Sequence, residues 1–200
     1  MNYRVITPPS EPITLEEART HLRVQPYGSP EEHPDDSYIT ALITSAREYC
    51  EQYLRRALAT QIIEFPLDDF GSEIDLPLKP AQQVESITYM DTAGATQTLA
   101  TTVYGLDIYS GTIFLKSGQS WPTVLAQKNA ITVKYTAGYT QGSPDDYELP
   151  EPIKSAMLLL IGNLYENRQE VNISNVRNTF NQLPFGAISL MQPYRTGLGV

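Results

Sequence analysis

Apolar residues recur at helical spacing in three stretches of the chain. The first stretch follows a capping box, in which Thr14 stands three residues before Glu17. It predicts a short helix from Leu15 to about Arg23. In the other two stretches, apolar positions return every three or four residues, which is typical of amphipathic helices. The predicted long helix runs from Asp36 to about Leu58, and the last helix runs from about Pro152 to Gln169.

Between the long helix and the last helix the period of the pattern changes to two. The segments QIIEFPL, EIDLPL, VESITYM, TIFLK and AITVKY are short, rich in β-branched and aromatic residues, and separated by Pro, Gly and Asp. Ile131, Val133 and Tyr135 alternate with polar residues, as in a strand with one buried face. The sequence therefore predicts a small, mainly antiparallel β-unit from Thr60 to Tyr139, with a hairpin turn at Asp91–Ala95.

These elements predict an α+β fold in three parts. Residues 1–59 and 141–170 would form a helical core, residues 60–140 an inserted β-rich unit, and residues 171–200 an extended C-terminal arm. The last helix contains MLLLI, which is apolar around most of its circumference and therefore needs cover on several sides. A neighbouring subunit is a natural cover. The residues predicted for the core and for such a subunit interface are Leu42, Ala46, Cys50, Met157, Leu158, Leu159, Leu160, Ile161 and Leu164.

The charge of the chain argues against a protein that grips nucleic acid. The formal net charge is −9, and the densest basic cluster is only the pair Arg55–Arg56. Binding to DNA phosphates depends on lysine and arginine side chains that release counterions. The single cysteine excludes an internal disulfide framework and fits a reducing cytoplasm. No apolar run approaches the roughly 20 residues that span a bilayer, and the N-terminus does not resemble a secretory signal.

Candidate catalytic and metal-binding groups are few. The sequence contains no G-x-S-x-G, Walker, G-x-G-x-x-G or H-E-x-x-H motif, so we expect no enzyme activity, no metal and no cofactor. His33 lies among acidic residues, and a solvated acidic loop is the better interpretation than a cation site. Cys50 lies on the apolar stripe of the long helix, where it should be a small buried residue. We expect Trp121 to plug the β-unit or to close its loop.

Four segments, taken in order and spacing, resemble the gp6-like head–tail connector (adaptor) family of tailed bacteriophages. They are ITLEEARTHLRV, DDSYITALITSAREYCEQYLRRAL, AITVKYTAGY and LPEPIKSAMLLLIGNLYENRQ, which begin at Ile13, Asp35, Ala130 and Leu149. A shorter piece, LPFGAISLMQPYR, is similar to the C-terminal end of the family. The chain departs from the family at Arg55, where a glycine commonly ends the long helix. This departure indicates that the helix continues toward Leu58.

The resemblance implies a structural protein of the virion neck. Family members form a ring of identical subunits, typically dodecameric, beneath the portal protein, and the ring extends the DNA channel. The implied partners are other copies of the chain, the portal protein, and a stopper or tail protein, while DNA passes without tight binding and no membrane is involved. Assembly would take place in the host cytoplasm. Two alternatives remain open: another virion tail-completion or baseplate protein, and a ligand-binding β-module on a helical scaffold.

The apolar C-terminal segment has two interpretations. It folds back onto its own subunit, or it docks onto a partner, and the polar stretch before it favours docking. About a dozen residues bury too little surface to offset their own ordering, so we expect the segment to be mobile until the portal binds it. The residues predicted to bind the portal are Leu183, Phe185, Ile188, Leu190, Met191, Tyr194 and Arg195.

Overall fold

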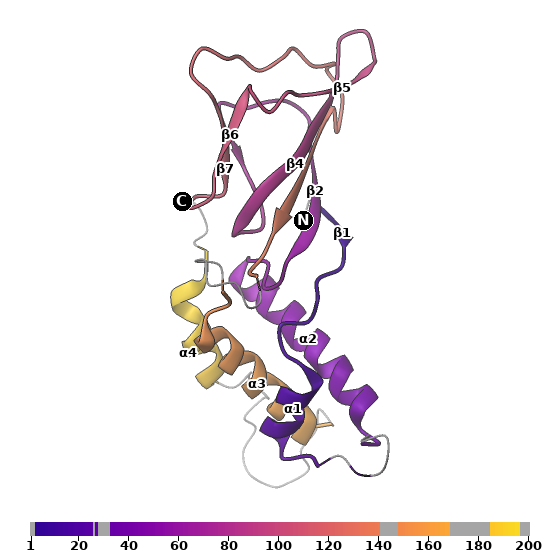
Figure 1. Cartoon of the computed structure of the whole chain (residues 1–200), viewed down its shortest axis with the longest axis vertical. Helices are drawn as coiled ribbons and strands as arrows, with labels where there is room; N and C mark the ends of the chain where they lie inside the picture. Colours follow the sequence, from indigo (N-terminus) through magenta and orange to yellow (C-terminus); the bar gives the residue numbers. More distant parts are fainter. Residues whose placement is uncertain (1–2, 26, 28–32, 141–147, 169–184, 197–200) are drawn as a thin grey trace, which may run out of the picture. The chain divides into compact units, whose positions relative to one another are not determined.

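The computed structural model describes residues 3–25, 27, 33–140, 148–168 and 185–196. The chain divides into two compact units (Figure 1). The β unit contains Met1–Ser10 and Ala59–Glu148, and the helical unit contains Glu11–Leu58 and Leu149–Val200. Helices in one unit and antiparallel sheets in the other confirm the predicted α+β class.

The β unit contains two antiparallel sheets. The five-stranded sheet has the order β1 (Arg4–Thr7), β2 (Gln61–Leu67), β8 (Ile131–Ala137), β4 (Ala81–Met90) and β5 (Thr96–Thr98). The three-stranded sheet has the order β3 (Ile74–Asp75), β7 (Thr112–Leu115) and β6 (Tyr104–Asp107). The predicted turn at Asp91–Ala95 joins β4 to β5, and the Asp91 N–H donates to the carbonyl of Ala95 at 2.9 Å.

Strand β8 is the centre of the five-stranded sheet, and its burial follows the predicted period of two. Ile131, Val133 and Tyr135 are completely buried, while the residues between them keep part of their surface. The Tyr135 hydroxyl accepts a hydrogen bond from the N–H of Leu78 at 3.2 Å. One face of β8 therefore supplies the core of the β unit, and the other face is polar.

The N-terminal strand was not predicted. Residues 1–59 were predicted to belong to the helical core, but β1 pairs with β2 at the edge of the sheet. Arg4 lies opposite Glu64 and forms an ion pair with it at 2.7 Å. All four residues of β1 are exposed. A short strand without a buried face has no alternation of apolar and polar positions, so the pattern alone could not reveal it.

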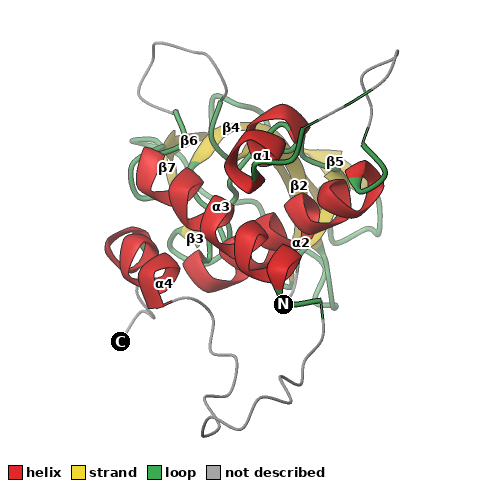
Figure 2. Ribbon diagram, turned by 90° about the horizontal axis from the view of Figure 1, so that it is seen from below, coloured by secondary structure: helices red, strands yellow, loops and turns green. Residues whose placement is uncertain are grey.

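The helical unit contains α1 (Leu15–Leu22), α2 (Asp36–Leu54), α3 (Glu151–Glu166), α4 (Phe185–Met191) and a 3₁₀ turn, η1 (Gln192–Tyr194). Helix α3 is central, because it contacts α1, α2 and α4 (Figure 2). The predicted capping box of α1 is confirmed: the Glu17 N–H donates to the Thr14 hydroxyl, and the Thr14 N–H donates to the Glu17 carboxylate.

Helix α2 is shorter than predicted. It ends at Leu54 and does not continue toward Leu58, because Arg55 adopts the left-handed conformation with a φ of 56°. The Arg55 N–H donates to the carbonyl of Glu51, which is the bond that a glycine usually makes at a helix end. Helix α3 also ends early, at Glu166 rather than Gln169. A left-handed arginine gives no sequence signal, so the end of α2 was misplaced.

The C-terminal segment is helical where an extended arm was predicted. Residues 185–194 form α4 and η1, and α4 packs against α3. Ala187 and Met191 lie one turn apart and are completely buried. Part of the cover of α3 that was assigned to a partner therefore comes from α4 of the same subunit.

Candidate functional site

The part of the chain that the structure describes contains no metal-binding cluster. No group of three or more His, Cys, Asp or Glu in this part of the chain could hold a metal ion. Burial raises the pKa of the Cys50 thiol to about 12, with Glu51 adding to the effect, so the thiol is neutral and unreactive. Cys50 is completely buried, as predicted. Among the described residues, no helix combines the length and the apolar character that crossing a bilayer requires.

The acidic residues near His33 hold the helices together. The Asp36 carboxylate accepts the N–H of His33 at 2.7 Å and forms an ion pair with Arg19 of α1. The Asp35 carboxylate accepts hydrogen bonds from the Tyr165 hydroxyl at 2.6 Å and from Arg168 at 2.9 Å. These bonds lower the pKa of Asp35, the Tyr165 bond most strongly. The two carboxylates therefore join α2 to α1 and to the end of α3.

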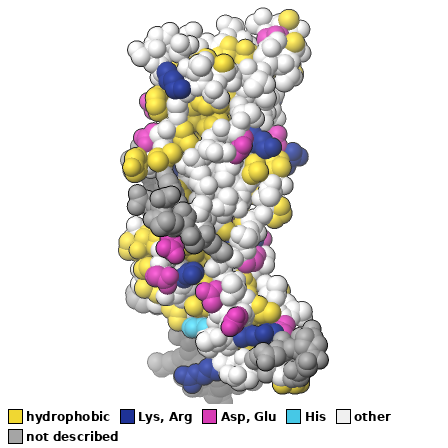
Figure 3. Space-filling model, in the orientation of Figure 1, with side chains coloured by type: hydrophobic (Ala, Val, Ile, Leu, Met, Phe, Trp, Pro, Cys, Tyr) yellow, Lys and Arg dark blue, Asp and Glu magenta, His cyan; other side chains and the backbone are white. Residues whose placement is uncertain are grey.

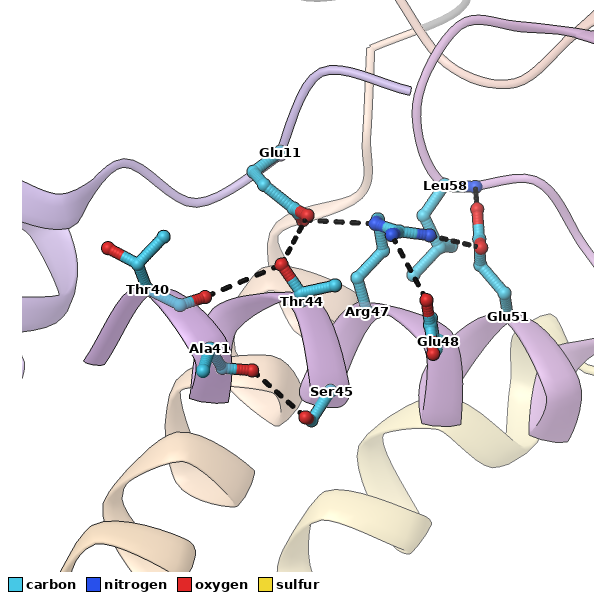
Figure 4. A network of polar contacts seen from close by, with 9 residues as sticks. All are labelled: Glu11, Thr40, Ala41, Thr44, Ser45, Arg47, Glu48, Glu51 and Leu58. Atoms are coloured by element: carbon cyan, nitrogen blue, oxygen red, sulfur yellow. Dashed lines mark hydrogen bonds and ion pairs between the residues drawn. The ribbon is translucent and has the colours of Figure 1, made fainter. Parts of the chain in front are cut away.

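Arg47 is the one arginine with a nearly buried side chain among the described residues, and it is surrounded by carboxylates (Figure 4). Its guanidinium donates to Glu11 at 3.0 Å and to Glu51 at 2.8 Å, with Glu48 at 3.7 Å. Burial opposes the charge, but Glu51 and Glu11 outweigh it, so the pKa of Arg47 lies above its ordinary value. The second oxygen of Glu51 accepts the N–H of Leu58 at 2.9 Å.

This network ties both ends of the first segment of the helical unit to α2. Glu11 is the first residue of the helical unit after β1, and Leu58 is its last residue before β2. Both are tied to α2 through Arg47 and its partner Glu51. The arrangement positions these chain segments against α2.

Replacing Arg47 by methionine should lower the free energy of unfolding by roughly 2–4 kcal/mol, because Glu11 and Glu51 lose their buried counter-charge. The value is below that for a fully buried pair, since the Glu11 side chain is 28% exposed and regains water. Far-UV circular dichroism during a urea titration measures the change. The variant Glu48→Gln is the control, because the Glu48 side chain is 60% exposed and should matter little. Equal transitions for the two variants would contradict the role of Arg47.

The residues predicted for the core and the subunit interface separate into two groups. Six of them are buried: Leu42, Ala46, Cys50, Met157, Leu160 and Ile161. The other three lie on α3 and keep apolar surface: Leu158 is half-buried, and Leu159 and Leu164 are 38% and 36% exposed. The first group belongs to the core of the helical unit, and the second group is only partly covered.

The structure holds the predicted portal-binding segment against the end of α2. The Tyr53 hydroxyl donates to the Gln192 side chain at 2.6 Å, and Arg56 Nε donates to the carbonyl of Tyr194 at 2.7 Å. The Thr196 hydroxyl donates to the carbonyl of Leu54 at 2.8 Å. These partners stand about 140 positions apart in the sequence, so sequence reasoning missed Tyr53 and Arg56 as part of this surface.

The exposure of the segment limits what a partner can reach. Met191 is buried within its own subunit. Ile188, Leu190 and Tyr194 are half-buried and Arg195 is exposed. Leu183 and the side chain of Phe185 lie outside the described residues.

Trp121 has a local structural contact. Its ring stacks on Phe70 with the centroids 4.7 Å apart, and Phe70 meets Tyr89 edge-on. The three rings join the loops that follow β2 and β7 to the end of β4. This contact agrees with the interpretation of Trp121 as a loop-closing residue.

Charged side chains of both signs are interspersed on the face drawn in Figure 3, where lysines and arginines lie beside acidic residues. The ion pairs of the β unit include Lys79 with Asp75 and Lys128 with Asp68. Within the described residues this face carries no continuous basic stripe of the kind that follows a DNA backbone.

Comparison with known proteins identifies relatives over the whole chain. The head completion protein family matches residues 13–195. A chain in a structure titled "Virion of native gene transfer agent (GTA) particle" has the same fold, with a TM-score of 0.77, 21% identity, and coverage of 100% of this chain and 98% of that chain. Comparison with curated protein sequences found no match.

Two further similar chains come from structures of a particle neck. One is titled "Neck of empty GTA particle computed with C6 symmetry", with a TM-score of 0.76, 21% identity, and coverage of 100% of this chain and 98% of that chain. The other is titled "Neck of native GTA particle computed with C12 symmetry", with a TM-score of 0.68, 22% identity, and coverage of 98% and 97%. The resemblance to connector-type proteins is thus confirmed. The chain belongs to the head completion protein family.

Proposed function

We propose that this chain is a head–tail connector (adaptor) subunit in the neck of a tailed phage or phage-like particle. Copies of the chain form a ring beneath the portal protein, extend the DNA channel and dock a stopper or tail protein. The observation that carries the proposal is the family match over residues 13–195, which covers both units of the chain. The end-to-end likeness of the fold to chains of a gene transfer agent neck supports it.

The proposed ring places α3 at the contact between subunits. The two neck structures were computed with C6 and C12 symmetry, which supports a closed rotational arrangement. In such a ring the contact is heterologous, so an apolar surface on one copy meets a different surface on the next. Leu158, Leu159 and Leu164 are the leucines of α3 that remain partly exposed.

Light scattering and negative-stain microscopy of the purified full chain test the ring. We expect the double variant Leu159→Glu/Leu164→Glu to remain a folded monomer, because each subunit contact would bury two carboxylates. The double variant Ser45→Glu/Gln52→Glu makes the same charge change at exposed positions of α2 and should still form rings. A wild-type chain that stays monomeric at every concentration, alone and with its portal, would contradict the proposal.

The chain should not bind duplex DNA appreciably at physiological salt, because its net charge is −9 and basic side chains such as Lys79, Lys128 and Arg168 are paired with carboxylates. We expect a dissociation constant weaker than about 10⁻⁴ M, the weak end of non-specific binding. A gel-shift titration at two salt concentrations measures it. Tight binding that weakens steeply with salt would contradict the proposed passive channel.

The proposed portal contact lies on the C-terminal segment. Ile188, Leu190, Tyr194 and Arg195 keep surface for a partner while the segment rests on its own subunit. A ring repeats the contact in every subunit, so a weak single contact becomes strong through multivalency.

A further inference from the structure

Three arginines belong to the C-terminal end of α2 and to the segment that lies against it. Arg55 and Arg56 follow the last turn of the helix, and Arg195 comes from the C-terminal segment. The Arg195 guanidinium lies over the ring of Tyr53, 5.0 Å from its centroid. Arg56 Nε donates to the carbonyl of Tyr194, and the carbonyl of Arg55 accepts the hydroxyl of Thr196. We call Arg55, Arg56, Arg195 and Tyr53 the arginine surface.

The guanidinium groups of this surface have no carboxylate partners among the described residues. Arg4, Arg19, Arg47 and Arg168 each form an ion pair, whereas Arg55, Arg56 and Arg195 form none. Arg23 is the remaining described arginine without an ion pair, and it lies at the end of α1. In a chain of net charge −9, carboxylates are abundant, so three unpaired arginines at one place form a local positive site.

Stabilisation of the α2 helix dipole does not explain the position of all three arginines. Basic residues just after a helix stabilise its negative end, which accounts for Arg55 and Arg56. Arg195 belongs to another segment, and its guanidinium lies over the face of the Tyr53 ring, 5.0 Å from the centroid. A guanidinium stacked on a ring keeps its edge free for two parallel hydrogen bonds to a carboxylate.

We propose that the arginine surface binds a carboxylate-rich segment of a partner protein in the neck. This inference rests on the proposed function, which supplies such partners, and it names the chemistry that the partner must present. The Arg56 side chain is anchored through Nε, so its terminal N–H groups remain free to donate to acidic side chains.

Charge arithmetic favours an acidic protein segment over DNA. Three arginines would neutralise about three phosphates, fewer than the 6–10 contacts of a protein that holds duplex DNA well. The negative charge of the whole chain also repels a long polyanion. A short acidic segment can lie within about a Debye length of the three arginines, so their attraction outweighs the repulsion by more distant carboxylates. A small positive site on an acidic protein therefore fits a short acidic peptide.

Fluorescence anisotropy of the full chain with a labelled polyglutamate decapeptide tests the inference, and a labelled duplex DNA is the second probe. We expect the peptide to bind, and the variant Arg55→Gln/Arg195→Gln to weaken binding by about tenfold or more, because two charge contacts are removed. The control Arg4→Gln/Arg23→Gln removes the same charge at exposed positions. Arg23 matches Arg55, since both cap a helix in the left-handed conformation. The control should bind the peptide like the wild type.

Three results would overturn the inference: no peptide binding by the wild type, equal losses in both double variants, or tighter binding of DNA than of the peptide. Microscopy on the same samples separates this question from the ring. If the chain forms rings that do not bind the peptide, the inference about the arginine surface is wrong and the proposed connector function is unaffected. If the chain stays monomeric but binds the peptide through Arg55 and Arg195, the inference about the arginine surface is supported and the proposed ring is contradicted.

Discussion

Replacing Gly138 by alanine is expected to destabilise the β unit by about 4 kcal/mol or more, which is exceptional for a single methyl group. Gly138 follows β8 with a φ of 111°, a conformation that residues with a side chain rarely adopt. A Cβ at this position would lie 2.0 Å from the carbonyl oxygen of Ala59 and 2.4 Å from its carbon. These are backbone atoms just before β2 and cannot rotate away. Strand β2 or β8 must therefore shift.

Gly94→Ala is the matched control for Gly138→Ala. Gly94 also has a positive φ, 82°, but a Cβ there would meet no atom within 4 Å. The substitution Gly94→Ala should lower the free energy of unfolding only by the strain of the left-handed conformation, about 1–2 kcal/mol. Trp121 is the single tryptophan and lies in the β unit, so its fluorescence during a urea titration reports on this unit. A Gly138 variant as stable as the Gly94 variant would show that the close approach to Ala59 does not constrain the β unit.

Elements with a long, regular pattern were predictable from sequence. Strand β8 lies between two strands and has one buried face, so its apolar residues alternate strictly. Helices α2 and α3 carry stripes of apolar residues because each packs one face against the rest of the helical unit. The capping box of α1 is local, since Thr14 and Glu17 satisfy each other without help from the rest of the chain.

Features set by distant partners were not predictable. Strand β1 depends on β2, and α4 depends on the surface of α3. Seven residues of α4 are too few to form a stable helix alone, so only tertiary contact reveals it. The end of α2 was misplaced because the left-handed cap falls on an arginine.

The candidate surfaces show the same division. The apolar stripe predicted that α3 is buried on one face and needs further cover, but not that α4 of the same chain covers part of it. Arg47 lies between the apolar residues Ala46 and Cys50, and one of its two hydrogen-bonded partners, Glu11, stands 36 positions away. The arginine surface likewise requires the C-terminal segment to reach the end of α2. A sequence pattern predicts which side chains are buried. The residues against which they pack depend on the fold.

Replacing Leu160 by alanine is expected to lower the free energy of unfolding by roughly 2–5 kcal/mol, the range for a leucine removed from a rigid core. Leu160 lies on α3 and is 1% exposed, so its methyl groups leave a cavity. The surroundings have little freedom to collapse, because α3 contacts α1, α2 and α4. The Tyr38 hydroxyl of α2 also donates to the carbonyl of Leu164 at 3.3 Å, which fixes α3 along α2.

Leu159→Ala is the control for Leu160→Ala, because it removes the same atoms from the next position of α3. Leu159 is 38% exposed, so Leu159→Ala should lower the free energy of unfolding by less than half as much as Leu160→Ala. Far-UV circular dichroism follows the helices in a urea titration, while Trp121 fluorescence follows the β unit, which contains no part of α3. A loss below about 1 kcal/mol for Leu160→Ala would mean that α3 is not the centre of the helical unit. A large loss for Leu160 with a small one for Leu159 would leave the exposed leucines of α3 free to serve the contact between subunits.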